Sequence, residues 1–557
     1  MGYYDNVNED LLRAIPPDAG KICEVGCGTG EMAHLYKQIN PDGRYYGIEL
    51  DFNSYREASE RRHVFADIVN SDCEKIWGYH YGMLAPDLDV LIYGDTLEHL
   101  KDPWSHLTHA VTEWVKPGGQ VIACVPNSQN FGLIVNLMLG SFEYQDEGLL
   151  DRTHLRFFTR ETLISLFEQA GLSVVSIEPR NWEEKWNAQH KQFLKLAEPL
   201  AKNYGVDSKD FARDTRAFQW LIKGVKGEPP ERKILIRAIS SNHCCRRPRI
   251  TEPGNFLATI PGVRFSEVET EVRPDETPVV IIQRDAFKIE QVRKLIHSGV
   301  LVIGEWDDWP GHFTANTETN YLPLKAVHAI STTTDTMAET LMQWNPNIGV
   351  FANQMASLPP VKTVNNDPPI IFCAWQNRSD DWKPIIDGFN AALKDHPEVQ
   401  VYIIGDREFY HAVRTDNKRF WTFQPYDKYI QLLRECDIAV LPMIDSVFSQ
   451  HKSDIKFLEC AANGVAVLAP IKSIYIKSVW GEPMRGTLFF NEEFEDTLRE
   501  CIEGVSCMDH ATAARKYVAS ERLLKDHYRD RLRWINALID TREELTEQLL
   551  ERCPELR

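Results

Sequence analysis

The sequence predicts an α/β protein built on parallel sheets. Short apolar segments alternate with stretches of helical periodicity from residue 21 to residue 226, and the alternation begins again at residue 233. This pattern is typical of parallel strands connected by helices that cover both faces of a sheet. The length of 557 residues exceeds what one hydrophobic core supports, so we expect about three or four domain-sized units.

Two breaks divide the predicted elements. The proline-rich, charged stretch 228–232 follows the first alternation, so we predict a first domain at 1–227 and a linker at 228–232. A second proline-rich break near residues 358–369 divides the remainder into two lobes. The predicted lobes are 233–365 and 366–557, and the second ends in charged segments with helical spacing.

Charge and hydropathy exclude several classes of protein. The formal net charge of -19 would repel a phosphate backbone, so we expect no nucleic-acid partner. We find no basic and apolar signal region at the start of the chain and no apolar run of about 18 residues, so no transmembrane segment is expected. The expected location is cytoplasmic, with peripheral attachment to the inner face of a membrane as an alternative.

A glycine-rich turn follows the first apolar segment. That segment ends in Glu24 and Val25, and the turn contains Gly26, Gly28 and Gly30. Glycines permit a tight turn and the close approach of a ligand to the backbone. Nicotinamide and flavin enzymes share such turns, so the turn alone leaves the cofactor open.

Acidic residues follow at later strand segments. Glu49 ends the next segment about twenty residues downstream, where a carboxylate accepts hydrogen bonds from both hydroxyls of a cofactor ribose. Asp67, followed by Ile68, lies in the segment after that, where an acidic side chain can accept from an adenine amino group. Together with the glycine turn, these residues predict a site for an adenosine-containing cofactor.

The order of these features resembles that of the class I methyltransferases, which use S-adenosyl-L-methionine. The Leu97-Glu98-His99 segment and the Pro117-Gly118-Gly119 turn belong to the same pattern and argue against a dehydrogenase. The resemblance covers residues 1–227 and implies a Rossmann-like domain. It implies cofactor contacts by Glu24, Gly26, Gly28, Gly30, Glu49, Asp67 and Ile68.

The expected source of catalytic groups is the segment from Asp95 to His99. Methyl transfer to a hydroxyl needs a base or a metal that makes the oxygen nucleophilic. The segment resembles the Glu-x-x-Glu-His element of metal-assisted O-methyltransferases, with Asp95 in the position of the first Glu. This resemblance implies catalytic roles, or a divalent metal site, for Asp95, Glu98, His99 and His154. The alternative is that both histidines only anchor loops through backbone hydrogen bonds.

Residues 182–215 have helical spacing and precede a strand segment at 217–223, which we expect to be the last strand of the first domain. The helical stretch is interpreted either as a cap over the acceptor pocket or as an ordinary amphipathic surface helix.

The second lobe contains a strand, a polar loop, a helix and another strand in order between residues 436 and 469. If Ser453 or Asp454 caps the helix, its free backbone amides and Lys452 face the loop and suit a diphosphate. Glu459 lies on the same helix, where a carboxylate suits a ribose diol.

This arrangement resembles the glycosyltransferase group 1 family of the two-lobed GT-B type, over roughly residues 233–540. Glu459 matches the second Glu of the family's Glu-x7-Glu element, whereas His451 stands at the first. The resemblance implies a pair of Rossmann-like lobes and a nucleotide-diphosphate sugar as donor. It implies donor contacts by Arg378, Lys383, Lys452, Ser453, Lys456 and Glu459.

Two further groups in the first lobe have alternative interpretations. Asp307 and Asp308 follow a strand segment and either orient an acceptor hydroxyl, as catalytic carboxylates, or are solvated turn residues. The basic cluster of Arg246, Arg247 and Arg249 either contacts a phosphate of donor or acceptor or lies in a solvated loop.

The leading hypothesis is a bifunctional enzyme of surface polysaccharide or glycolipid biosynthesis. It would transfer a sugar from a nucleotide sugar and methylate a hydroxyl on the same glycan or glycolipid acceptor. One alternative is an active methyltransferase with a non-catalytic glycan-binding module. Another is methylation of a small lipid-like or protein acceptor unrelated to the sugar.

Overall fold

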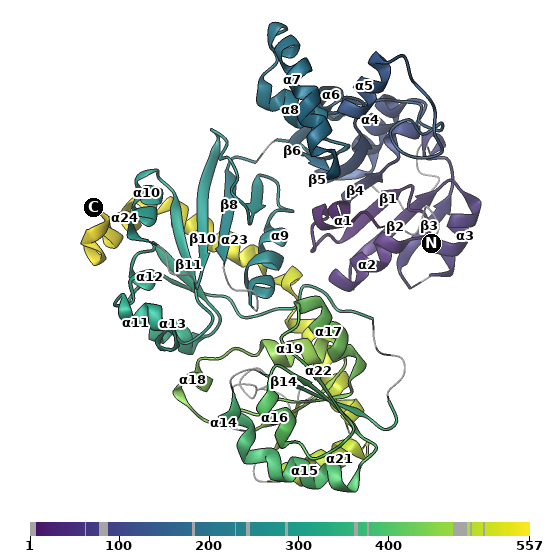
Figure 1. Cartoon of the computed structure of the whole chain (residues 1–557). Helices are drawn as coiled ribbons and strands as arrows, with labels where there is room; N and C mark the ends of the chain where they lie inside the picture. The colour runs from purple at the N-terminus through teal and green to yellow at the C-terminus, as the bar shows by residue number, and fades with distance from the viewer. Residues whose placement is uncertain are drawn as a thin grey trace. The chain divides into compact units, whose positions relative to one another are not determined.

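The computed structural model describes residues 7–61, 63–76, 87–180, 184–228, 230–240, 245–284, 288–360, 362, 366–375, 378–471, 487–490, 493–504 and 507–557 (Figure 1). Pro229 of the predicted linker lies outside these residues. The chain divides into two compact units. Unit 1 comprises Met1–Lys233 and Ala258–Val263, and unit 2 comprises Ile234–Leu257 and Arg264–Arg557.

Unit 1 is built on a seven-stranded sheet in the order β3-β2-β1-β4-β5-β7-β6. The first five strands pair in parallel, whereas β7 is antiparallel to both of its neighbours. The strands are β1 (Lys21–Val25), β2 (Arg44–Glu49), β3 (Phe65–Asn70), β4 (Leu88–Gly94), β5 (Val115–Pro126), β6 (Leu172–Arg180) and β7 (Gln219–Lys226). The predicted last strand at 217–223 is therefore present as β7.

Helices connect these strands and cover the sheet (Figure 1). They are α1 (Glu9–Ala14), α2 (Glu31–Ile39), α3 (Phe52–Glu60), α4 (Pro103–Glu113), α5 (Phe131–Met138), α6 (Arg160–Gln169), α7 (Asn187–Asn203) and α8 (Ser208–Arg216), with short 3-10 helices η2 (Cys73–Lys75), η3 (Leu97–His99) and η4 (Glu184–Trp186). The helical spacing at 182–215 corresponds to α7 and α8.

Alternate residues of the central strands enter two separate hydrophobic cores. Leu91 and Tyr93 of β4 belong to one buried cluster, whereas Val90 and Ile92 belong to the other. A strand buried on both faces needs apolar residues at nearly every position, which is why β4 is continuous in hydrophobicity. The strand order reverses between β1 and β4, and ligands of such sheets bind at the carboxyl ends of the strands next to this point.

Unit 2 contains two six-stranded sheets, which form two lobes. The first sheet has the order β13-β12-β11-β10-β8-β9 and the second has the order β16-β15-β14-β17-β18-β19. The first-lobe strands are β8 (Lys233–Ser240), β9 (Val263–Ser266), β10 (Glu276–Gln283), β11 (Leu301–Glu305), β12 (Ala329–Thr332) and β13 (Ile348–Val350). The second-lobe strands are β14 (Ile370–Ala374), β15 (Gln400–Ile404), β16 (Lys418–Trp421), β17 (Ile438–Val440), β18 (Ala466–Pro470) and β19 (Thr487–Phe490).

The second sheet is parallel throughout, with the strand order of a Rossmann fold and its reversal between β14 and β17. The predicted α/β class, with one Rossmann-like domain followed by a pair of Rossmann-like lobes, is confirmed.

The helices of unit 2 include short turns and long C-terminal segments. Those of the first lobe are η5 (Arg247–Thr251), α9 (Glu252–Leu257), α10 (Ile289–His297), η6 (Pro310–His312), α11 (Thr314–Glu318), α12 (Leu322–Lys325) and α13 (Asp335–Leu341). Those that follow are α14 (Ser379–Trp382), η7 (Lys383–Ile385), α15 (Ile386–Asp395), α16 (Arg407–Ala412), α17 (Tyr426–Glu435), α18 (Val447–Gln450), α19 (Ile455–Ala462), α21 (Phe494–Ile502), α22 (Cys507–Glu521), η8 (Leu524–Asp526), α23 (Tyr528–Asp540), α24 (Arg542–Arg552) and η9 (Pro554–Leu556).

The end of the chain packs on the first lobe. Leu549, Cys553 and Leu556 belong to the buried cluster that contains Val280 and Val302 of the first sheet. By contrast, Tyr517 and Val518 of α22 belong to a core of the second lobe. The last helices, assigned from the sequence to the second lobe, therefore pack against the first. No helix within the described part of the chain is long and apolar enough to cross a membrane.

Candidate functional site

The glycine turn of unit 1 connects β1 to α2 in a conformation that requires glycine. Gly26, Gly28 and Gly30 have φ values of 76°, 53° and 84°, in the left-handed region. A Cβ atom on Gly30 would lie 2.6 Å from the Phe65 ring, and one on Gly26 would lie 2.7 Å from Thr96 Oγ1. The turn therefore excludes side chains for both conformational and steric reasons.

Glu49 is fixed beside this turn at the end of β2. Its Oε2 accepts a hydrogen bond from the Gly28 amide at 2.7 Å, and its Oε1 accepts one from the Asp51 amide at 2.8 Å. The side chain is buried, and burial raises the pKa of its carboxyl. The structure thus brings together the predicted turn and the predicted ribose-binding carboxylate.

The other predicted cofactor residues lie differently. Glu24 is buried and its Oε2 accepts from the Tyr45 hydroxyl at 2.9 Å; burial raises the pKa of Glu24 to about 8. Asp67 is exposed and lies three residues before the end of β3, in register with Tyr46 rather than with Glu49. Its Oδ1 accepts from the amide of Ile68. The structure does not bring Asp67 and Ile68 level with Glu49.

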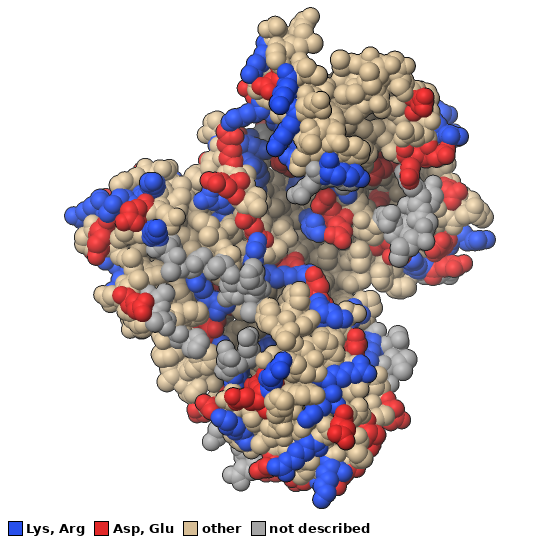
Figure 2. All heavy atoms as spheres, viewed as in Figure 1, with Lys and Arg blue, Asp and Glu red and all other residues tan. Residues whose placement is uncertain are grey.

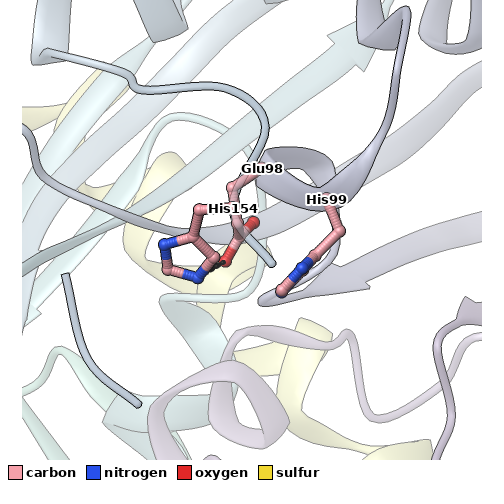
Figure 3. A group of neighbouring side chains, drawn as sticks. All are labelled: Glu98, His99 and His154. Atoms are coloured by element: carbon pink, nitrogen blue, oxygen red, sulfur yellow. Dashed lines mark ion pairs between the residues drawn. The ribbon is translucent and has the colours of Figure 1, made fainter. Parts of the chain in front are cut away.

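A second cluster follows β4 and consists of Glu98, His99 and His154. One ligand atom from each lies within 4.8 Å of the others, and His154 Nε2 is 4.0 Å from Glu98 Oε1. Figure 3 shows the Glu98 carboxylate between the two imidazole rings, with Glu98 and His99 coming from η3 and His154 from the facing loop. Three of the four residues predicted to act in methyl transfer are therefore adjacent.

Both rings of the cluster are oriented by backbone carbonyls. His99 Nδ1 lies 3.2 Å from the Thr153 carbonyl oxygen, and His154 Nδ1 lies 3.3 Å from that of Leu149. These are the loop-anchoring bonds of the alternative interpretation. They occupy Nδ1 only, so each neutral ring carries its lone pair on Nε2, which is the usual arrangement of histidine ligands and bases.

The Glu98 carboxylate is buried without compensation from the protein. Its side chain is 1% exposed, and neither oxygen has a hydrogen-bond partner among the described residues. Burial, together with the charges of Asp95 and Asp151, raises the pKa of Glu98 well above its ordinary value. Burial and the neighbouring His154 lower the pKa of His99, which favours the neutral ring. A buried carboxyl group without hydrogen-bond partners beside two imidazole rings is a donor set that fits a divalent cation such as zinc.

Asp95, the fourth predicted member, does not belong to this cluster. It has a φ of 49°, and its Oδ1 accepts a hydrogen bond from the Gln219 side chain of β7. Burial raises the pKa of Asp95 to about 6, although the charge of Arg180 acts in the opposite direction. The structure therefore does not place Asp95 among the possible metal ligands beside Glu98.

The cluster and the glycine turn are joined by Thr96. Its hydroxyl donates to the carbonyls of Val25, at the end of β1, and Gly94, at the end of β4. The loop that carries Glu98 is thereby held against the start of the turn. The two groups of predicted residues therefore share the edge of the sheet where its strand order reverses.

In unit 2, the two carboxylates of the first lobe are ion-paired. Arg284 Nε lies 3.0 Å from Asp307 Oδ1, and Lys452 Nζ lies 2.8 Å from Asp308 Oδ1. Asp307 is 7% exposed. The interpretation of this pair as solvated turn residues is wrong.

The predicted donor residues lie around α19, and each contacts another protein group. Glu459 is buried and accepts from the Tyr429 hydroxyl at 3.1 Å, and burial raises its pKa. Lys456 lies over the ring of Tyr429. Ser453 Oγ accepts a hydrogen bond from the side-chain amide of Asn353 at 2.7 Å.

The remaining residues of this region are also engaged. Arg378 pairs with Asp381, and the exposed Lys383 lies 3.4 Å from Asp380. His451, in the position of the family's first Glu, uses both ring nitrogens: Nδ1 lies 2.6 Å from the Val447 carbonyl oxygen and Nε2 lies 2.7 Å from Thr340 Oγ1.

Each of the three arginines in the basic cluster of the first lobe takes part in an ion pair. Arg246 pairs with Glu267, and Arg247 pairs with Glu252 and Asp427. Arg249 is 2% exposed and pairs with Glu305 at 2.7 Å. The prediction of a solvated loop is therefore wrong for Arg249, which is part of the core.

Sequence reasoning missed the partners that hold the site residues. Tyr45, Gln219 and Tyr429 each donate to one predicted carboxylate and come from segments between 21 and 124 residues away. No local pattern marks these residues, because each contact depends on which strands and helices become neighbours.

One protein-family model matches part of the chain, within the predicted first domain. Residues 3–177 match the family model described as "Methyltransferase domain". No curated protein matches the chain.

Solved structures resemble each part of the chain at low identity. A SAM dependent methyltransferase from Archaeoglobus fulgidus is 20% identical, with 40% of this chain and 95% of that chain covered and a TM-score of 0.30. TarM is 12% identical, with 47% of this chain covered and a TM-score of 0.37. A TarM variant from S. aureus, in complex with Fondaparinux, alpha-GlcNAc-glycerol and UDP, is 11% identical, with 48% of this chain covered and the same TM-score. The chain spans 55% of the length of either TarM structure. These values are low, so we infer the function from the side chains of this chain.

Proposed function

We propose that unit 1 is an S-adenosyl-L-methionine-dependent O-methyltransferase. The observation that carries this proposal is the junction of two groups at one sheet edge: a glycine turn bonded to the buried Glu49, and the adjacent Glu98, His99 and His154. The family match over residues 3–177 supports it. In this proposal the turn and Glu49 hold the cofactor, and the cluster prepares the acceptor hydroxyl.

The proposed chemistry is an in-line displacement. The hydroxyl oxygen of the acceptor forms a bond to the methyl carbon as the carbon–sulfur bond of the sulfonium breaks, and the hydroxyl proton must leave. His154 Nε2 is suited to accept it, because its Nδ1 is directed to the Leu149 carbonyl. In its ionised form Glu98, beside that ring, would favour the resulting imidazolium, whereas burial raises the pKa of its carboxyl.

In an alternative to the role of His154 as a base, the same three residues would hold a divalent cation, with His154 Nε2 as a ligand. When bound, such an ion would lower the pKa of a coordinated hydroxyl, and the Glu98 charge would be compensated. The backbone bonds to His99 and His154 Nδ1 fix the rings for this role. Asp95 is left out of this set of ligands, because its carboxylate accepts a hydrogen bond from the Gln219 side chain.

Binding measurements test this proposal without knowledge of the acceptor. S-adenosylhomocysteine should bind the full chain, and Glu49→Ala should weaken binding at least about tenfold, because a buried acceptor of ribose hydrogen bonds is lost. Glu98→Gln should bind the product as well as the parent does. Failure of the parent chain to bind S-adenosylhomocysteine would contradict the proposal.

Cobalt(II) titration tests the cation site by its visible absorption, which is independent of activity. We expect one ion per chain and loss of the absorption band in Glu98→Gln and in His154→Asn. His34→Asn, on α2 and outside the cluster, is the matched control and should keep the band. If both cluster variants keep the band, the three residues are not the ligands.

For unit 2 we propose a nucleotide-sugar site formed by Arg378, Lys383, Lys452, Ser453, Lys456 and Glu459. Support comes from their placement around the start of α19 and after β14, next to the strand reversal of the second sheet. Lys452 is paired with Asp308, so a diphosphate would have to replace that carboxylate. The proposed acceptor of both activities is a glycan or glycolipid.

A pair of opposite variants tests this site. Lys452→Gln should weaken the binding of a nucleoside diphosphate, whereas Asp308→Asn should strengthen it several-fold because it frees the lysine. Uridine, guanosine and adenosine diphosphates are the probes. If none binds, the alternative of a module without a nucleotide donor is favoured. If one binds, hydrolysis of the matching nucleotide sugar that is lost in Glu459→Ala would separate a transferase from a binding module.

A further inference from the structure

Exposed apolar side chains are concentrated in one part of unit 1. Of the 24 large hydrophobic side chains that are exposed in the described chain, 12 lie between residues 137 and 206. The four most exposed of all are Met138 at 78%, Leu139 at 78%, Leu196 at 79% and Tyr204 at 82%. Single exposed hydrophobic residues need no explanation, but such a concentration marks an interaction surface.

Helix α7 carries two distinct lines of side chains. Leu196, Leu200 and Tyr204 are spaced by four residues and follow one side of the helix, where all three are exposed. Lys191, Lys195 and Lys202 are also exposed, and their spacings of four and seven place them on another side. An apolar side and a lysine side on one exposed helix are typical of helices that lie in the plane of a lipid interface.

The apolar surface continues from α7 to α5. Phe131, at the start of α5, contacts Phe193 and His190 of α7. Helix α5 then leads to the exposed Leu137, Met138 and Leu139. Figure 2 shows the surface of unit 1 over α5 and the end of α7 as largely uncharged, with basic side chains beside it.

The same surface reaches the loop that carries His154. Phe142 contacts both Tyr144 and Phe157, and these aromatic side chains are exposed together with Leu155. The amide of Leu155 donates to the Glu98 carbonyl, so this exposed group borders the Glu98–His99–His154 cluster. We call the set of Leu137, Met138, Leu139, Phe142, Tyr144, Leu155, Phe157, Leu196, Leu200 and Tyr204 the apolar surface.

Charge distinguishes this region from the rest of unit 1. Residues 184–216 contain seven Lys and Arg against five Asp and Glu, whereas residues 1–136 contain 10 against 20. The exposed Glu143, Asp146 and Glu147 lie beside Phe142 and Tyr144, so the basic side chains of the region come from α7 and α8. An anionic surface would therefore be attracted to α7 and α8 more than to the rest of unit 1. Each basic residue close to an anionic membrane adds to the attraction, and salt screens it.

The two sides of α7 also favour a lipid partner. Helices α7 and α8 lie at one end of unit 1 in Figure 1. A helix with apolar side chains on one side and lysines on another can enter the headgroup region of a bilayer.

We propose that the apolar surface docks unit 1 on an anionic phospholipid bilayer, with the apolar side of α7 and the end of α5 inserted at the headgroup boundary. The exposed group of Phe142, Tyr144, Leu155 and Phe157, which borders the Glu98–His99–His154 cluster, then faces the membrane, and this orientation assigns a lipid-linked hydroxyl compound as the methyl acceptor. The docking itself does not depend on the proposed function, whereas the assignment of the acceptor does.

Flotation of the full chain with vesicles tests the docking. Phosphatidylcholine vesicles with and without phosphatidylglycerol are the probes. We expect binding to the anionic vesicles that decreases with added salt. The variant Leu196→Ser, Leu200→Ser, Tyr204→Ser should bind at least about tenfold more weakly, because each inserted side chain contributes about a factor of ten or more. Lys191→Gln, Lys195→Gln, Lys202→Gln should reduce binding only to the anionic vesicles.

Two controls separate docking from folding and from cofactor binding. Val268→Ser with Met342→Ser removes two exposed apolar side chains of unit 2 and should leave flotation unchanged. All variants should bind S-adenosylhomocysteine with parental affinity if they are folded. A parent chain that binds S-adenosylhomocysteine but does not float with anionic vesicles would overturn the docking while leaving the methyltransferase proposal intact. Equal flotation of the α7 variant and the parent would overturn it as well.

Discussion

At the residue scale, the glycine turn of unit 1 illustrates two separate costs of adding a side chain. Gly30 and Gly140 have φ values of 84° and 79°, so an alanine at either position is strained to a similar degree. The two positions differ in the room available for a Cβ atom. A Cβ on Gly30 would lie 2.6 Å from the Phe65 ring, whereas nothing lies within 4 Å of the corresponding position on Gly140.

We therefore predict unequal effects of the two alanine substitutions. Gly140→Ala should lower the free energy of unfolding by about 1 kcal/mol, from backbone strain alone. Gly30→Ala should cost about 2 kcal/mol more, from overpacking against Phe65, and should weaken S-adenosylhomocysteine binding. Urea unfolding and calorimetric titration measure the two effects. Equal losses of stability would mean that the turn relaxes to accommodate the methyl group.

The buried Glu24 provides a second prediction, on pH. Burial raises its pKa from 4.5 to about 8, and the charge of Glu49 acts in the same direction. The folded state therefore holds a proton that the unfolded state releases, so the contribution of Glu24 to stability is present below pH 4.5 and is lost as the pH rises to about 8. The upper bound of this contribution is on the order of 5 kcal/mol.

The measurement is urea unfolding of the transition that responds to S-adenosylhomocysteine, followed across this pH range. The parent chain should lose stability as the pH rises, and Glu24→Gln should have a flatter profile because it cannot ionise. Both keep an acceptor for the Tyr45 hydroxyl. A parent profile that is flat or rises with pH would show that Glu24 is ionised in the folded state.

Residue types and spacing predicted which of several side chains lie together, but not the partners of these side chains. The glycine turn, Glu49 and the group of Glu98, His99 and His154 lie together as local motifs suggest. Asp95 satisfies the same motif, yet its carboxylate is bonded to Gln219, which lies 124 residues later in the chain. The spacing of residues within a motif contains no information on a hydrogen-bond partner that is distant in the sequence.

At the element scale, hydrophobic alternation predicted the strands well because buried parallel strands need continuous apolar segments. The predicted strand at 217–223 is β7, and the helical stretch at 182–215 is α7 and α8. Which lobe a helix packs against was not predictable from periodicity. The residues from Leu549 to Leu556 join the first-lobe core although they follow the second lobe in sequence.

A buried ion cluster links the C-terminal helix α23 to the first lobe. Glu305, at the end of β11, pairs with Arg249 at 2.7 Å and faces Arg531 of α23 at 3.9 Å. All three residues are buried. Burial, and then the charge of Arg249, lowers the pKa of Arg531 to about 9. One carboxylate thus compensates two buried guanidinium groups.

We predict that Glu305→Gln lowers the free energy of unfolding of unit 2 by about 3–5 kcal/mol, because two buried cations lose their counter-charge. The matched control is Glu276→Gln, which should lower the free energy of unfolding less, because its partner Arg264 is more exposed and is a single cation. Chemical unfolding of both variants gives the comparison. Similar losses in the two would mean that water compensates Arg249 and Arg531 in the variant.

At the scale of the whole molecule, the chain consists of two units with separate sheets and separate hydrophobic cores. Each unit places its predicted ligand residues at a strand reversal of its own sheet. The proposed cofactor of unit 1 and the proposed donor of unit 2 therefore have no shared residues. This separation makes the two proposals independently testable in one sample.

We expect the full chain to unfold in two transitions in a calorimetric scan. Excess S-adenosylhomocysteine should raise the midpoint of one transition only, because a ligand at about a hundred times its dissociation constant adds about 2.7 kcal/mol to the state that binds it. For a domain of this size the shift is roughly 5–10 °C. A nucleoside diphosphate should raise the other midpoint in the same way. If each ligand moved both transitions, the units would be thermodynamically coupled, and occupancy of the donor site would then alter the affinity of unit 1 for its cofactor by the same factor as the reverse.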